Sequence, residues 1–225
     1  MSTRTETAAC NATRAAPRDA SDTARTLPLA TVRTLAASAH IGDLVFIRVT
    51  ARPFRAVADA TGSWTNHVGI VVDTSGAEPM VAESTFPWAK LTPLSRFVAR
   101  SEGGRLALAR LATPPTADEQ RRVHAAAERR IGTLYDTGFN LRSRRQFCSR
   151  YVREVLGDAT GIEPGDVETF ATLLERRPGA KLGFWRLWYF GRIPWERETV
   201  TPASLLRSSK LTLEFDGIVF DPGRA

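Results

Sequence analysis

The pattern of hydrophobic and polar residues predicts strands in the first half of the chain. Four segments are rich in β-branched and apolar residues and are bounded by turn residues: 42–49, 67–72, 80–83 and 105–111. Such runs are typical of strands. The turn residues at 74–76 separate the second segment from the third, so these two are expected to form an antiparallel hairpin.

Apolar residues that recur every three to four positions predict helices, most of them in the second half of the chain. Thr116 and Glu119 form a capping-box pattern that opens one helix, and Gly132 is expected to stop it. Further helices are expected at 29–39, 54–60, 166–176 and from Thr201-Pro202, and a last strand at 211–220.

The helix that follows Phe147 carries the most informative residue of the chain. Cys148 stands at its expected start, and apolar side chains follow on the same face at helical spacing until Gly157, which is expected to end the helix. Helix N-termini stabilise anions, so a thiol there ionises more easily, and the thiolate is the nucleophilic form. The pattern therefore indicates a reactive cysteine.

The order of these elements predicts an α+β fold, in which a small antiparallel sheet or partial barrel packs against helices. Residues 1–26 are poor in large apolar side chains and are expected to be a disordered tail, in which Cys10 is incidental. Residues 27–225 are expected to form a single domain, with an aromatic-rich insertion near 184–195.

The composition excludes several classes of function. The net charge is +7, and only three of the 31 basic residues are lysines. No zinc-finger or helix-turn-helix signature accompanies this charge, so no nucleic-acid partner is expected. Two cysteines are too few for a disulfide framework or a cysteine-rich zinc site, and no metal or cofactor is expected. The chain has no long apolar run and no apolar leader, so a cytoplasmic location is expected.

A histidine and a carboxylate on the predicted hairpin complete a candidate triad with Cys148. If the turn is centred on Ser75, His67 and Glu83 are directly opposed on one face, with Cβ atoms roughly 4.5–5.5 Å apart. A slip of one residue would place them on opposite faces. Taken singly, a buried cysteine or a strand histidine is more often structural, but an unpaired buried Glu83 would be costly.

Five short motifs resemble the circularly permuted NlpC-type, papain-like hydrolases, in particular their YiiX-like and YebB-like branch. In chain order they are Gly42-Asp43-Leu-Val-Phe, Asn66-His67-Val-Gly-Ile-Val, Val81-Ala-Glu83-Ser, Leu134-Tyr135-Asp136 and Phe147-Cys148-Ser149. In papain-like enzymes the nucleophile precedes the histidine, whereas in the permuted branch the histidine strand comes first, as it does here. The resemblance covers about residues 40–156 and implies a permuted papain-like fold.

The resemblance also implies a function. The Cys-His-Glu triad of the family maps onto Cys148, His67 and Glu83 of a cysteine-dependent hydrolase. Such an enzyme would cleave an amide bond in a peptide or peptidoglycan fragment through an acyl-enzyme intermediate. The candidate substrate contacts are Tyr135, Asp136, Asn66 and Ser149.

Two alternatives remain open from the residues alone. The same cysteine could serve a lipid or acyl thioesterase or acyltransferase, or the fold could be a non-catalytic module that binds a small molecule or peptide. The aromatic segment 184–195 could pack as core or lid, line a pocket for an acyl chain or a sugar–peptide, or contact a membrane interface. The sequence leaves the oligomeric state open.

Overall fold

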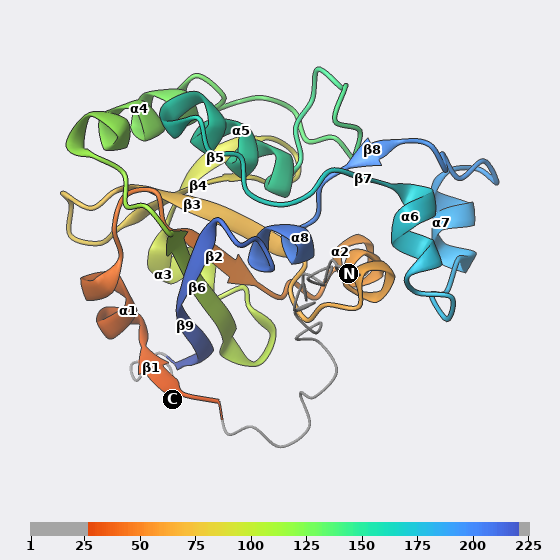
Figure 1. Ribbon diagram of the computed structural model, residues 1–225. Coiled ribbons are helices and arrows are strands. Elements are labelled where there is room, and N and C mark those ends of the chain that lie inside the picture. Colours follow the sequence, from red (N-terminus) through yellow and green to blue (C-terminus); the bar gives the residue numbers. More distant parts are fainter. Residues whose placement is uncertain (1–26, 221–225) are drawn as a thin grey trace, which may run out of the picture.

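The computed structural model describes residues 27–220 (Figure 1). The expected disordered tail, with Cys10, lies outside the described residues.

A seven-stranded sheet forms the centre of the described chain (Figure 1). Its strands, in spatial order, are β1 (Leu29–Thr31), β9 (Leu211–Phe220), β6 (Arg105–Leu111), β2 (Leu44–Ile47), β3 (His67–Asp73), β4 (Met80–Ser84) and β5 (Ala89–Pro93). Every neighbouring pair is antiparallel except β1 with β9, which is parallel. A second, two-stranded sheet joins β7 (Glu168–Thr169) to β8 (Glu198–Thr199).

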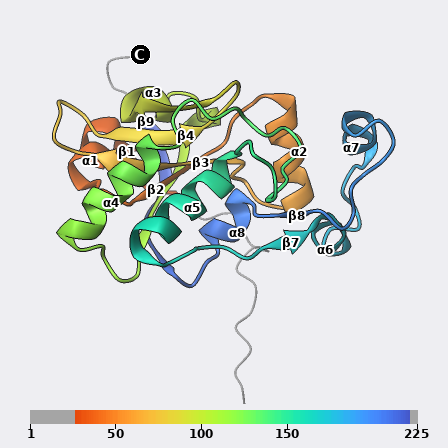
Figure 2. The same ribbon diagram turned by 90° about the horizontal axis from the view of Figure 1, so that it is seen from above.

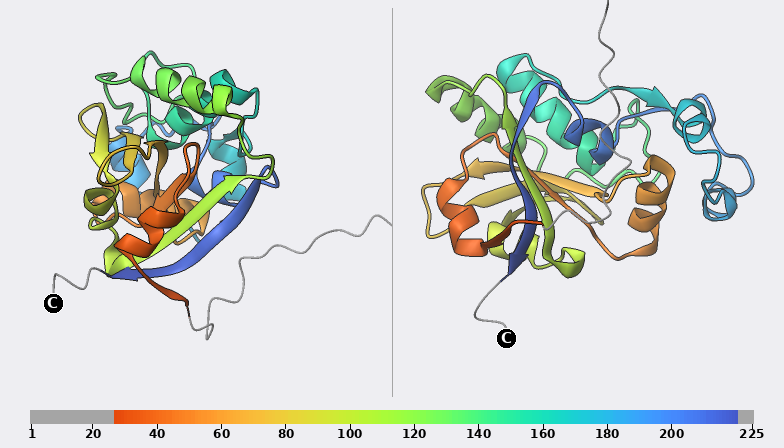
Figure 3. Two further views of the ribbon diagram at one scale, coloured as in Figure 1. Left: turned by 90° about the vertical axis from the view of Figure 1, so that its left-hand side faces the viewer. Right: turned by 60° about the horizontal axis from the view of Figure 1, so that its bottom comes forward.

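Helices cover both faces of the large sheet, because successive strand residues alternate between two apolar clusters. Helices α4 (Ala117–Glu128) and α5 (Cys148–Thr160) pack on one face, and α1 (Val32–Ser38) and α3 (Leu94–Val98) on the other (Figure 3). The remaining helices are α2 (Arg52–Thr61), η1 (Glu102–Gly104), α6 (Phe170–Glu175), α7 (Gly183–Trp188) and α8 (Pro202–Leu206). This arrangement confirms the α+β class.

The predicted start of α5 is confirmed, but its predicted end is wrong. The helix begins at Cys148 and continues through Gly157 to Thr160, and Gly161 ends it in the left-handed conformation, with φ 75°. Gly157 serves packing instead, because a Cβ there would lie 2.9 Å from Cγ of Glu163.

Tertiary pairing overrides helix propensity at two other predicted helices. Residues 29–31 pair with β9 before α1 begins, and Glu168 and Thr169 pair with β8 before α6 begins. The capping box of α4 is confirmed, since Thr116 and Glu119 each accept a backbone N–H of the other, although α4 ends at Glu128, before Gly132.

Helices α6 and α7 project from one side of the sheet (Figure 2). Their base is anchored by a small apolar cluster in which Phe170 and Trp185 pack against Ala56 and Ala60 of α2. The aromatic segment expected near 184–195 therefore forms α7 and the turn that follows it.

Candidate active site

His67 and Glu83 lie on one face of the sheet, in a register different from the predicted one. Strand β3 pairs with β4 so that Ile70 is opposite Ala82, and the register shifts near Asp73, towards the turn. Continuing that pairing makes Glu83 a diagonal neighbour of His67 rather than its direct partner. The predicted direct opposition is therefore wrong, but the error is an even number of residues, so both side chains keep the same face. His67 Nε2 lies 2.7 Å from Glu83 Oε2.

Two aromatic rings hold the imidazole in place. Phe97 of α3 stacks on the His67 ring with centroids 5.6 Å apart, and Phe54 of α2 meets it edge-on, also at 5.6 Å. Gly69 makes room for the stack, because a Cβ there would lie 2.9 Å from the Phe97 ring and 2.5 Å from Val81. The glycine of the His-Val-Gly motif thus has a packing role.

Glu83 is fully buried and has three hydrogen-bond donors. Besides His67, Thr92 Oγ1 donates to Oε1 at 2.6 Å, and Arg100 Nη2 donates to Oε2 at 2.7 Å. The Arg100 guanidinium also lies 4.9 Å from the centroid of the Phe97 ring. Thr92 and Arg100 could not be predicted from the sequence, because neither belongs to a motif. They reach the site only through the pairing of β5 with β4 and the position of α3.

The neighbouring groups set the charges of Glu83 and His67. Burial favours the neutral carboxyl group, but the hydrogen bond and charge of His67, the charge of Arg100 and the hydrogen bond of Thr92 together lower the pKa of Glu83 to about 2. Burial likewise favours a neutral imidazole, but Cys148 and Glu83 raise the pKa of His67 to about 9. At neutral pH the buried pair is therefore a carboxylate and an imidazolium.

Cys148 interacts with the His67 imidazole, whose Nε2 is held by Glu83. His67 Nδ1 is buried and has no hydrogen-bond partner of ordinary geometry among the described residues, and the Cys148 sulfur is the first among the groups that raise the pKa of His67. Cys148 itself is buried and is the first residue of α5. The side chain of the preceding residue, Phe147, forms no hydrogen bond to the N-terminal backbone amides of the helix.

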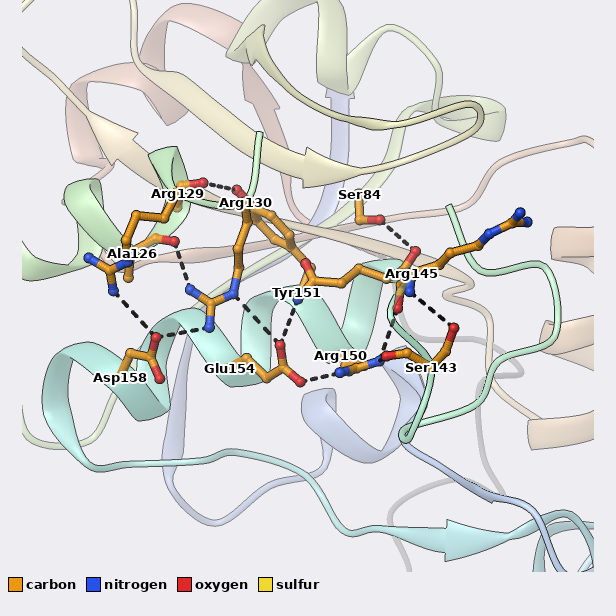
Figure 4. Close-up of polar contacts among 12 residues, drawn as sticks. Ser84, Ala126, Arg129, Arg130, Ser143, Arg145, Arg150, Tyr151, Glu154 and Asp158 are labelled. Carbon is orange, nitrogen blue, oxygen red and sulfur yellow. Dashed lines mark hydrogen bonds and ion pairs between the residues drawn. The ribbon is translucent and has the colours of Figure 1, made fainter. Parts of the chain in front are cut away.

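The loop before Cys148 is held to α5 by the Arg150 side chain (Figure 4). Arg150 Nη1 donates to the carbonyl oxygens of Ser143, at 2.7 Å, and Arg145, at 2.9 Å, while its Nε donates to Glu154 at 2.6 Å. From the sheet, Ser84 Oγ donates to the next carbonyl, that of residue 146, at 2.9 Å. These contacts fix the backbone that enters the helix at the cysteine.

Tyr135 is the second polar side chain that interacts with Cys148. Burial and the charge and hydrogen bond of Cys148 raise the pKa of the Tyr135 hydroxyl well above its usual value. Its oxygen is buried and has no hydrogen-bond partner of ordinary geometry in residues 27–220. The hydroxyl therefore lies beside the candidate nucleophile, in the lining of the same pocket, where it can donate to a group bound at Cys148.

An apolar pocket opens beside Cys148. Tyr135, Asn66 and Ser149 line it, together with apolar residues of α2, α6 and α7, among them Phe170 and Trp185, and with Phe139 and Phe147 of the segment before α5. The pocket thus combines the candidate nucleophile with a mainly apolar wall.

The side chains of three predicted substrate contacts form hydrogen bonds with the backbone of the protein itself. The Asn66 amide exchanges two hydrogen bonds with the backbone of Val49, and Ser149 Oγ donates to the carbonyl oxygen of Val200 at 2.7 Å. The carboxylate of Asp136 accepts the backbone N–H groups of residues 138 and 140 and shapes the loop there. Their substrate-binding roles stay predictions.

Comparison with known proteins identifies the family of this chain. Residues 38–213 match the family described as "Permuted papain-like amidase enzyme, YaeF/YiiX, C92 family". The chain belongs to this family. The match confirms the resemblance to permuted papain-like enzymes, and an amidase family supports a cysteine hydrolase in general.

A relative and a solved structure, both from Escherichia coli, support the assignment of this chain to the family. The chain is 28% identical over 186 residues to the uncharacterized protein YiiX of Escherichia coli K12, across 82% of this chain and 90% of the relative. A crystal structure titled "metalloprotein yiiX", from Escherichia coli O157:H7, matches with a TM-score of 0.70 and 25% identity, covering 80% of this chain and 98% of the other.

Neither a metal site nor a membrane span is visible in the described part of this family member. Within residues 27–220, no three His, Cys, Asp or Glu side chains are grouped so that they could hold a metal ion. None of the helices there is long and apolar enough to cross a bilayer. The residues present therefore do not fit a bound metal, and no step of the chemistry below uses one.

Proposed function

We propose that the chain is a cysteine amidase that acts through a Cys148–His67–Glu83 triad and an acyl-enzyme intermediate. The observation that carries the proposal is the buried imidazole of His67, whose Nε2 lies 2.7 Å from Glu83 Oε2 and whose pKa is raised by its interaction with Cys148. This is the arrangement in which a histidine can exchange a proton with a nucleophile while a carboxylate fixes its orientation.

In the proposed reaction, Cys148 Sγ attacks the amide carbonyl carbon as a thiolate, its proton having passed to His67. The oxyanion that forms lies near the backbone N–H of Cys148 at the start of α5, and the Tyr135 hydroxyl is a second donor. The C–N bond then breaks as the His67 imidazolium protonates the leaving amine, which leaves a thioester on Cys148. Water, deprotonated by His67, attacks that thioester and releases the carboxylic acid and the thiol.

Glu83 keeps one orientation of the imidazole and stabilises its positive charge throughout the cycle. Thr92 and Arg100 act through Glu83, because both donate to its carboxylate. They are positioning residues in this mechanism.

The apolar wall of the pocket favours a substrate whose acyl part is apolar. Phe139, Phe170 and Trp185 lie beside the cysteine and offer few polar groups to a peptide backbone. The same wall supports a second candidate function, thioester or ester chemistry on a lipid-like acyl group, because the acyl-enzyme would be identical and only the leaving group would differ.

The leaving group is therefore what the test must vary. One acyl group is offered as a 4-nitroanilide, a 4-nitrophenyl ester and a thioester, in a short-chain and a long-chain series. Each reaction is followed by absorbance and by the intact mass of the protein. The amidase proposal expects turnover of the anilide and a transient acyl adduct on Cys148 that is absent in Cys148→Ala.

Turnover of esters and thioesters alone would support the second candidate. A third outcome is that wild type turns over none of the series, forms no adduct, and binds the acyl ligands as tightly as Cys148→Ala does. The chain would then be a binding module, and both catalytic proposals would fail.

A further inference from the structure

The outer side of α7 and the turn after it expose large apolar side chains that the proposed chemistry does not use. Phe190 is 94% exposed and Leu187 is 79% exposed, the two highest values among the large apolar residues of the described chain. Leu187 lies in α7 and Phe190 in the turn after it, and α7 belongs to the part of the chain that projects from the side of the sheet (Figure 2).

The segment that carries them is strongly basic. Residues 176–197 contain six basic residues and one acidic residue, Glu196, so this stretch holds a net charge of +5 out of +7 for the whole chain. Arg176 pairs with Glu168, and Arg197 donates to the backbone of the loop at 138. Lys181, Arg186 and Arg192 are exposed and take part in none of the ion pairs within residues 27–220.

The inner side of the same segment is fixed to the protein. Trp185 is buried against Phe170, and Tyr189 stacks on Trp185 with centroids 6.1 Å apart. Trp188 Nε1 donates to the carbonyl of residue 137 at 2.9 Å, and Tyr189 Oη donates to that of residue 138 at 3.1 Å. Because these contacts hold α7 from one side, Leu187 and Phe190 are kept pointing outward.

We propose that this tip, formed by Leu187, Phe190, Lys181, Arg186 and Arg192, docks on the surface of an anionic lipid bilayer. Aromatic and aliphatic side chains enter the headgroup region, and neighbouring cations bind the lipid phosphates, a combination typical of interfacial anchors. A second copy of the chain fits less well, since two basic tips repel each other.

Docking would place the lipid surface close to the active-site pocket. Trp185 lines the pocket beside Cys148, and Leu187 stands two residues farther along the same helix. The tip is defined by exposure and charge alone, so this inference does not rest on the proposed function, and binding is measured without catalysis.

The experiment is co-sedimentation of the full chain carrying Cys148→Ala with large unilamellar vesicles. Vesicles of phosphatidylcholine mixed with an equal part of phosphatidylglycerol are compared with phosphatidylcholine alone, at low and high salt. Binding is expected only to the anionic vesicles and is expected to weaken with salt. Both Leu187→Ser with Phe190→Ser and Arg186→Ser with Arg192→Ser should weaken it on the order of tenfold or more.

Two control variants match these changes elsewhere on the surface. Leu29→Ser with Leu213→Ser removes two exposed leucines of β1 and β9, and Arg33→Ser with Arg121→Ser removes two exposed cations. Both controls should bind like the parent, and circular dichroism should show that all four variants are folded.

Three results would overturn the proposal. The first is the absence of binding to anionic vesicles. The second is binding that is weakened to the same extent by the tip variants and by the control variants. The third is a chain that self-associates through the tip, so that Leu187→Ser with Phe190→Ser converts a dimer to a monomer and vesicle binding is absent.

Discussion

The charged state of His67 predicts an unusual loss of stability at alkaline pH. The ring has a pKa of about 9 in the folded protein, against 6.5 for an ordinary histidine. That difference corresponds to about 3 kcal/mol of folding free energy, because one pH unit is about 1.4 kcal/mol. The sign follows from the raised pKa: the stabilisation is fully present below pH 6.5 and is lost as the pH rises through about 9.

His67→Gln removes the titrating group and keeps a side chain of similar reach. Urea unfolding followed by circular dichroism gives the free energy of unfolding for both proteins at about pH 6 and about pH 9.5. Wild type should lose about 3 kcal/mol between these two pH values. The variant should be less stable than wild type at about pH 6 and should lose much less on going to about pH 9.5.

His40→Gln is the matched control, since His40 is exposed and its ring contacts no triad residue. It should keep the wild-type pH dependence. If His67→Gln showed the same alkaline loss as wild type, the loss would come from other groups, and the assignment of an imidazolium to His67 would be refuted.

Three further substitutions test separate contacts. Gly69→Ala places a Cβ against Phe97 and should destabilise the protein by about 1–3 kcal/mol in urea unfolding; an unchanged midpoint would contradict the packing account. Arg150→Leu removes the donor that holds the loop before Cys148 and should cost about 2 kcal/mol, with faster proteolysis in that loop; equal protection from proteolysis would argue against its positioning role. Tyr135→Phe should lower kcat about a hundredfold with little change in KM if the hydroxyl binds the oxyanion, whereas an unchanged kcat would remove it from the mechanism.

Local sequence patterns were sufficient for the elements that carry the triad. Strand β3 and the start of α5 were predicted correctly, because each depends on a short run of residues with its own periodicity. The shared face of His67 and Glu83 was also predicted correctly, since the register error at these two residues was even.

The groups that tune the triad could not be predicted, because they depend on contacts between distant segments. Arg100 reaches Glu83 only after α3 has packed on the sheet, and α3 was not recognised among the apolar residues that follow β5. The same limit applies to Gly157, where the contact with Glu163, outside the helix, decides the role of the glycine.

The central claim, that Cys148 is a nucleophile activated by His67, is tested most directly by iodoacetamide alkylation. Rates are measured against pH in a Cys10→Ser background, with and without His67→Ala. The account predicts that at about pH 7 Cys148 reacts at least about tenfold faster with His67 present, since an imidazolium beside the sulfur favours the thiolate. Equal rates in the two proteins at every pH would show that Cys148 is a packed core residue, and the proposed mechanism would be wrong.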